Sequence, residues 1–198
     1  IMIKSTYIKS LLERAKKDLK TIVLPEGEDE RVLAAAHMIT AEKAAKVIIL
    51  GDVEKIKEFY ATKGWSLTDI ELVKPEEDSR LPEYTELLYN LRKEKGLSRE
   101  DATKLALNYN YFGTLMIKSG HADGMVSGAC HSTADTLRPC LQILKTKPGT
   151  KLVSAFFLMV VPDCEYGANG TFVFADSGLN QNPNPEELAA IAASSAES

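Results

Sequence analysis

The segment of residues 120–144, GHADGMVSGACHSTADTLRPCLQIL, is the part of the sequence around which the rest is organised. Residues 122–126 are typical of a short buried strand, and 127–133 form a loop of small and polar residues. The residues that follow have the pattern of a helix carrying Arg138. A strand that leads through such a loop into a helix directs the free amides of the first helical turn toward one point. The segment therefore predicts a binding site for phosphate or a similar anion.

Pro139 restricts where this helix can begin, because proline has no amide hydrogen and fits best in a first turn. We expect Asp135 or Thr136 to cap the helix, which puts Arg138 in the first turn. A cation at that end opposes the helix dipole, so its presence favours a role in holding an anion. The buried side of the helix is expected to comprise Leu137, Cys140, Leu141 and Leu144.

The loop and the start of the helix supply the other candidate ligands of the anion. A glycine lets the backbone approach a ligand closely, and hydroxyl groups donate hydrogen bonds. The candidates are Ser127, Gly128, Ser132, Thr133 and Thr136. In the alternative interpretation, Ser132 and Thr133 only cap the helix and Arg138 pairs with a surface acid. The loop is neither a Walker A sequence nor a G-x-G-x-x-G turn.

Composition and charge limit the classes of function. The chain has 198 residues and a net charge of -4, with basic residues scattered along it, which argues against a nucleic-acid or anionic-membrane partner. The longest apolar stretch, residues 152–161, is too short to cross a bilayer. The three cysteines, Cys130, Cys140 and Cys164, lack C-x-x-C spacing, so free thiols in a reducing cytoplasm are expected.

Neither a metal site nor a nucleophilic cysteine is predicted. Three dispersed histidines do not form a metal centre. Cys130 and His131 are neighbours along the chain, and such neighbours rarely face each other. Arg92 is a further candidate, although a basic residue at the end of a helix is also the ordinary pattern.

Helical patterns alternate with short, evenly apolar strands at residues 21–24, 47–50, 70–73 and 122–126. This alternation predicts a three-layer α/β domain whose mostly parallel sheet has helices on both faces. The pattern changes after residue 145, so we place a first domain at 1–147 and a second at 148–198. The second contains two apolar segments, 152–161 and 171–175, that are typical of a hairpin, and then a helix beginning near Pro185.

Several blocks of the sequence resemble one enzyme family. They are LPEGEDER (24–31), LRKEKG (91–96), NYFGTL (110–115), SGACHSTADTLRP (127–139), VPDCEYG (161–167) and FVFADSG (172–178). With these blocks, the chain resembles phosphate acetyltransferases from about Tyr7 to its end. The resemblance implies reversible transfer of an acetyl group between coenzyme A and phosphate.

The resemblance carries further expectations. The family's two α/β domains are arranged as in isocitrate and isopropylmalate dehydrogenases, and its members are usually cytoplasmic homodimers. The coenzyme A thiolate attacks acetyl phosphate directly, so no metal or other cofactor is implied. Residues matching Arg92 and Arg138 are implicated in binding coenzyme A or the phosphoryl group and in catalysis. The residue matching Cys164 lies near the site without being an essential nucleophile.

The family's sequences continue well beyond residue 198. The continuation carries a Ser-Arg pair and an aspartate proposed as the base, and it completes the second domain. We therefore expect this chain to be inactive alone and to leave apolar surface uncovered. Two alternatives are a phosphate butyryltransferase and a non-catalytic module of the same fold that binds coenzyme A or another anion.

Overall fold

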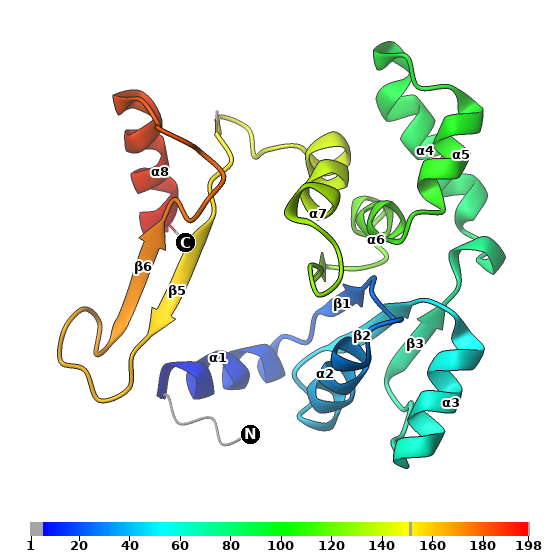
Figure 1. Cartoon of the computed structure of the whole chain (residues 1–198), viewed down its shortest axis with the longest axis horizontal. Coiled ribbons are helices and arrows are strands. Elements are labelled where there is room, and N and C mark those ends of the chain that lie inside the picture. Colours follow the sequence, from blue (N-terminus) through cyan, green and yellow to red (C-terminus); the bar gives the residue numbers. More distant parts are fainter. Residues whose placement is uncertain (1–5, 151, 198) are drawn as a thin grey trace. The chain divides into compact units, whose positions relative to one another are not determined.

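The computed structural model describes residues 6–150 and 152–197, and it divides into two units (Figure 1). One unit comprises residues 13–145, and the other comprises residues 146–198 with the first twelve residues. The division falls inside α1 (Thr6–Lys17). Each unit is described by itself.

A four-stranded sheet lies at the centre of the larger unit. Its strands are β1 (Thr21–Leu24), β2 (Lys46–Leu50), β3 (Ile70–Val73) and β4 (Gly124–Met125), in the order β3-β2-β1-β4. Every pair is parallel. The strand predicted at 122–126 contains only two residues, which pair with Ile22 and Val23 of β1.

Helices cover both faces of this sheet (Figure 1). They are α2 (Glu30–Ala41) and α3 (Val53–Lys63) on one face, and α4 (Leu81–Arg92), α5 (Arg99–Ala106) and α6 (Tyr109–Lys118) on the other. Alternate residues of a strand point to opposite faces. Accordingly, Val47 and Ile49 belong to the core beneath α2 and α3, whereas Ile48 and Leu50 belong to the core beneath α4 to α6. The predicted α/β class, with a parallel sheet covered on both faces, is confirmed for this unit.

Short-range signals in the sequence account for most helix ends. Asp52 caps α3, and Gly64 ends it in the left-handed conformation. Ser98 caps α5 and exchanges hydrogen bonds with Asp101. Two short 3₁₀ turns, η1 (Pro75–Glu77) and η2 (Lys93–Lys95), flank α4.

The helix after β4 begins earlier than predicted. Ser132 caps α7 (Thr133–Pro139), so the prediction of Asp135 or Thr136 was wrong. Arg138 consequently lies in the last turn, and the argument from the helix dipole does not hold for it. The Ser132 hydroxyl accepts from the Asp135 amide and donates to its carboxylate, and this reciprocal cap outweighs the preference of Pro139 for a first turn.

Pro139 lies inside the helix and is buried, and a π-helical turn, η3 (Cys140–Leu144), follows it. Proline cannot donate to the carbonyl four residues back, and the wider turn closes instead through a bond from the Lys145 amide to the Cys140 carbonyl at 3.1 Å. The change of pitch alters the buried face. Leu141, predicted to be buried, is exposed, while Ile143 is fully buried.

Gly27 lies where β1 and β2 approach each other, and its amide donates to the Leu50 carbonyl at 3.0 Å. A Cβ atom there would lie 2.5 Å from that carbonyl oxygen and 2.8 Å from Ile49 Cγ2. We expect Gly27→Ala to lower the free energy of unfolding by about 2 kcal/mol, because backbone must shift to admit the methyl group. Urea denaturation measures the loss.

Gly124→Ala is the matched control, since its nearest neighbour is the flexible tip of Ile22 at 3.3 Å. A cost below about 1 kcal/mol is expected for this variant. An equal loss of unfolding free energy in both variants would contradict the explanation that close backbone contacts at Gly27 cause the destabilisation.

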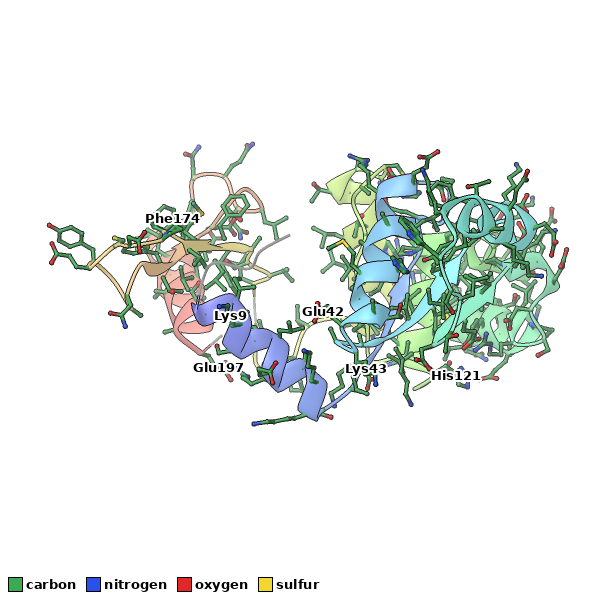
Figure 2. All side chains as sticks on the ribbon, turned by 90° about the horizontal axis from the view of Figure 1, so that it is seen from below. Lys9, Glu42, Lys43, His121, Phe174 and Glu197 are labelled. Atoms are coloured by element: carbon green, nitrogen blue, oxygen red, sulfur yellow. The ribbon has the colours of Figure 1, made fainter. Side chains whose placement is uncertain are left out.

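The smaller unit contains an antiparallel hairpin, as predicted, formed by β5 (Phe156–Val160) and β6 (Thr171–Ala175). The helix α8 (Pro185–Glu197) follows. Large apolar side chains of both strands are exposed, among them Phe157 and Phe174, the latter labelled in Figure 2. In the part of the chain that the structure describes, the helices lack the length and apolar character needed to cross a membrane.

Candidate functional site

The carboxyl ends of β1 and β4 meet because the two strands are parallel neighbours. Glu26 follows β1, and the loop of residues 127–132 connects β4 to α7 (Figure 1). Hydrogen bonds to Ala129 and Cys130 place Glu26 beside this loop. Crevices outside the carboxyl ends of parallel strands are the usual ligand sites of such sheets. The sequence candidates in this loop therefore lie in a suitable place.

The Glu26 carboxylate occupies the centre of the loop. It is 1% exposed and accepts hydrogen bonds from four consecutive backbone amides. These belong to Gly128, Ala129, Cys130 and His131, with distances of 2.8 to 3.2 Å. The amides of this loop therefore bind a carboxylate of the protein itself, and anion binding by the amides of the first helical turn stays a prediction. Gly128 adopts a φ of 114°, which bends the loop around the carboxylate and favours glycine.

Glu26 is ionised in this environment. Burial alone would raise its pKa, but the hydrogen bonds from the Cys130 amide, the His131 ring and the other loop amides outweigh burial and lower the pKa to about 2. Among the acidic residues at 26–30, Asp29 caps α2, whereas Glu26 binds the amides of the loop.

Arg31 ties the same loop to α2. Its guanidinium group binds both oxygens of Asp29 and donates to the Ala129 carbonyl at 2.8 Å. Nothing in the local pattern distinguished this arginine from other charged residues of a helix. The loop is thus held on both its amide and its carbonyl side.

Cys130 and His131 do face each other, contrary to our expectation. The Cys130 Sγ and His131 Nδ1 atoms are 3.7 Å apart, and both contact Glu26 Oε1, at 3.5 and 2.8 Å. Because an ionised carboxylate can only accept, His131 Nδ1 is the donor in its contact with Glu26. Burial and the carboxylates of Glu26 and Glu28 raise the pKa of the Cys130 thiol to about 12, so it remains protonated at neutral pH.

The hydroxyl candidates mainly stabilise the loop and α7. Ser127 donates to Asn110 Oδ1 at 2.7 Å, and Thr136 donates to the Ser132 carbonyl at 3.2 Å. Ser132 is the cap of α7, and Thr133, its first residue, is exposed. The capping interpretation of Ser132 is therefore confirmed, and a role of these hydroxyls in ligand binding stays a prediction.

Arg92 and Arg138 both act electrostatically on one buried tyrosine. Tyr111, on α6, donates to Gln142 Oε1 at 2.9 Å. Burial raises the pKa of Tyr111, and the positive charges of Arg138 and Arg92 both act against that rise. Both guanidinium groups thus lie within electrostatic range of one phenol, although their helices are far apart in sequence. The Arg138 side chain is 58% exposed, and its distance to the Asp135 carboxylate is 3.8 Å.

Cys164 lies in the other unit, in the connection between β5 and β6, and is partly buried. Its predicted place near the anion site stays a prediction.

Comparison with known proteins identifies the family. The family model described as phosphate acetyl/butaryl transferase matches residues 6–198. The chain belongs to this family. A phosphate acetyltransferase of Acetivibrio thermocellus is 50% identical over 196 residues, which cover 98% of the chain and 58% of that protein. One from Thermoanaerobacterium thermosaccharolyticum is 46% identical over 191 residues, again covering 58% of that protein.

Solved structures of the family share the fold. A phosphotransacetylase from Streptococcus pyogenes superposes with a TM-score of 0.88 at 40% identity, over 97% of this chain and 56% of that one. The EutD phosphotransacetylase from Staphylococcus aureus gives 0.80 at 39% identity, over 92% and 55%. The chain spans little more than half the length of these family members.

Proposed function

We propose that the whole protein transfers an acetyl group reversibly between coenzyme A and inorganic phosphate, giving acetyl phosphate and free coenzyme A. The observation that carries the proposal is the pair of arginines near Tyr111, in a chain that belongs to the phosphate acetyl/butaryl transferase family. Both substrates are anionic. Two guanidinium groups from different helices supply planar, permanently charged donors for them.

In this proposal Arg138 binds the phosphoryl group and stabilises the negative charge that grows as the acyl bond breaks. Its exposed side chain and its long, weak contact with Asp135 leave the guanidinium group free to reorient. Positive charge beside the breaking bond stabilises the transition state more than the substrate, because the negative charge grows there. Arg92 binds a second phosphate, and Ser127, Gly128, Ser132, Thr133, Thr136 and Cys164 border the substrates.

The remaining features follow from the same proposal. The whole protein has two α/β domains with the dehydrogenase-like arrangement, the first extending to about residue 147 and the second beginning at 148. It is a cytoplasmic homodimer, has no nucleic-acid partner and uses coenzyme A as a substrate, with no metal or other cofactor required for transfer.

A butyryl substrate is the second candidate, because the description of the matching family model covers both activities. Coenzyme A release from acetyl-CoA and butyryl-CoA in the presence of arsenate separates the two. We expect kcat/KM of the full-length protein to favour the acetyl substrate by at least about tenfold, which corresponds to 1 to 3 kcal/mol for added methylene groups in a small pocket. A butyryl preference would contradict the acetyl proposal, and binding of coenzyme A without turnover would indicate a non-catalytic module.

A further inference from the structure

The loop before α7 brings three different metal-binding groups together. A carboxylate oxygen of Glu26, the Cys130 thiol and the His131 ring nitrogen all lie within 4.8 Å of one another. A fourth group is adjacent, because Glu28 Oε1 lies 3.5 Å from Cys130 Sγ. Sulfur, imidazole nitrogen and carboxylate oxygen are the donors that zinc uses in proteins.

The spacing of these atoms agrees with one ion at their centre. Zinc bonds of about 2.3 Å to sulfur and about 2.1 Å to nitrogen or oxygen, at tetrahedral angles, put sulfur about 3.6 Å from each of the other ligands. Cys130 Sγ lies 3.7 Å from His131 Nδ1 and 3.5 Å from the oxygens of Glu26 and Glu28. The contact between Nδ1 and Glu26 Oε1 is shorter, at 2.8 Å, because a proton bridges the two atoms.

The surroundings suit a preformed site. The loop that carries Cys130 and His131 is fixed by its amide bonds to Glu26 and by Arg31 at the Ala129 carbonyl. Glu26 Oε2 accepts from the Gly128 and Ala129 amides at 3.1 and 2.8 Å, so these two bonds still hold the loop when Oε1, which accepts from the Cys130 and His131 amides, also binds an ion. Cys130 is exposed, which gives an ion access from solvent.

We propose that Glu26, Cys130 and His131, with Glu28 beside them, form a binding site for Zn²⁺ or a similar thiophilic divalent cation. Binding replaces the thiol proton of Cys130 and the Nδ1 proton of His131. The ring remains neutral by taking a proton at Nε2, so one proton is released for each ion bound. None of these ligands is Arg92 or Arg138. Zinc binding can therefore be measured whether or not the protein has the proposed transfer activity.

Titration of the full-length protein with Zn²⁺ against a chromophoric chelator, under reducing conditions, tests the proposal. We expect a micromolar or tighter site that Cys130→Ser weakens by more than about 100-fold, beyond the roughly 10- to 100-fold that the loss of an outer-shell partner costs. Cys164→Ser is the control and should leave the affinity unchanged. Binding that is only millimolar, or that Cys130→Ser does not affect, would overturn the proposal.

Cobalt provides a second readout that does not depend on affinity alone. Co²⁺ bound to the wild-type protein should show the near-ultraviolet absorption of a cobalt–thiolate bond, and Cys130→Ser should abolish it. His131→Asn, which keeps the loop backbone and Cys130, should retain this absorption and weaken zinc binding. Persistence of the band in Cys130→Ser, or unchanged zinc affinity in His131→Asn, would contradict the ligand assignment.

Discussion

Replacing Glu26 by glutamine should lower the free energy of unfolding at neutral pH by about 3 kcal/mol. The glutamine side chain fits the same space but retains one acceptor oxygen, and its amide group would face backbone amides that are themselves donors. Four amides of the loop 128–131 now bond to the carboxylate, so at least one would lose its acceptor in a buried place. Urea denaturation of Glu26→Gln and wild type measures the difference.

The stability of the same variant should also depend less on pH in the acid range than the stability of the wild type does. The folded-state pKa of Glu26, about 2, lies below its ordinary value of 4.5, so its contribution to stability is fully present above pH 4.5. The contribution is lost as the pH falls from 4.5 through 2, and the shift corresponds to about 3 kcal/mol. The difference in the free energy of unfolding between wild type and Glu26→Gln should therefore become smaller as the pH falls across this range.

Glu54→Gln is the matched control, because Glu54 is an exposed acid paired only with Lys57 in the described structure. It should change stability by less than about 0.5 kcal/mol at any of these pH values. Hydrogen exchange adds a local readout: the amides of 128–131 should lose protection in Glu26→Gln and keep it in Glu54→Gln. Unaltered protection in both would show that the carboxylate does not organise the loop.

Periodicity and capping signals predicted most of the fold. Strands of four or five residues such as Thr21–Leu24 are apolar on both faces, which is possible only between two layers of helices, and the structure has those layers. Aspartate at 52 and glycine at 64 define helix ends through bonds to adjacent residues, so a local pattern suffices. The start of α7 was missed because two local rules conflicted there, and the Ser132–Asp135 cap prevailed over the position of Pro139.

The site was predicted less well, because its contacts join residues distant in sequence. No local pattern shows that the amides of the loop bind the carboxylate of Glu26, about a hundred residues earlier in the sequence. Tyr111 was not singled out in the sequence, because its proximity to two arginines depends on how α4, α6 and α7 pack. Arg138 was selected from its expected place in a first helical turn and Arg92 from the basic end of a helix. The family resemblance, whose blocks preserve such distant relationships, then implied a binding role for both.

Replacing Arg138 by alanine should reduce acetyl transfer by the full-length protein at least about 100-fold, equivalent to about 2.7 kcal/mol of transition-state stabilisation. The structure predicts little cost in stability, because the side chain is more than half exposed and its contact with Asp135 is long. Arg138→Lys should recover only part of the rate, since an ammonium group cannot bind two phosphate oxygens through a planar pair of donors. Steady-state kinetics with acetyl phosphate and coenzyme A provides the measurement.

Two controls separate a direct role of Arg138 from a general loss of positive charge. Arg99→Ala removes an exposed arginine of α5 that pairs with Glu86, and Asp135→Asn removes the partner of Arg138 itself, so both should retain transfer within a few-fold. If Arg92 and Arg138 bind parts of the same anionic complex, their effects are coupled. The variant that lacks both arginines should then lose less transition-state stabilisation than the sum of the losses in the two single alanine variants. An Arg138→Ala protein as active as Arg99→Ala would remove Arg138 from the site, because a charge on the last turn of α7 would then have no part in the reaction.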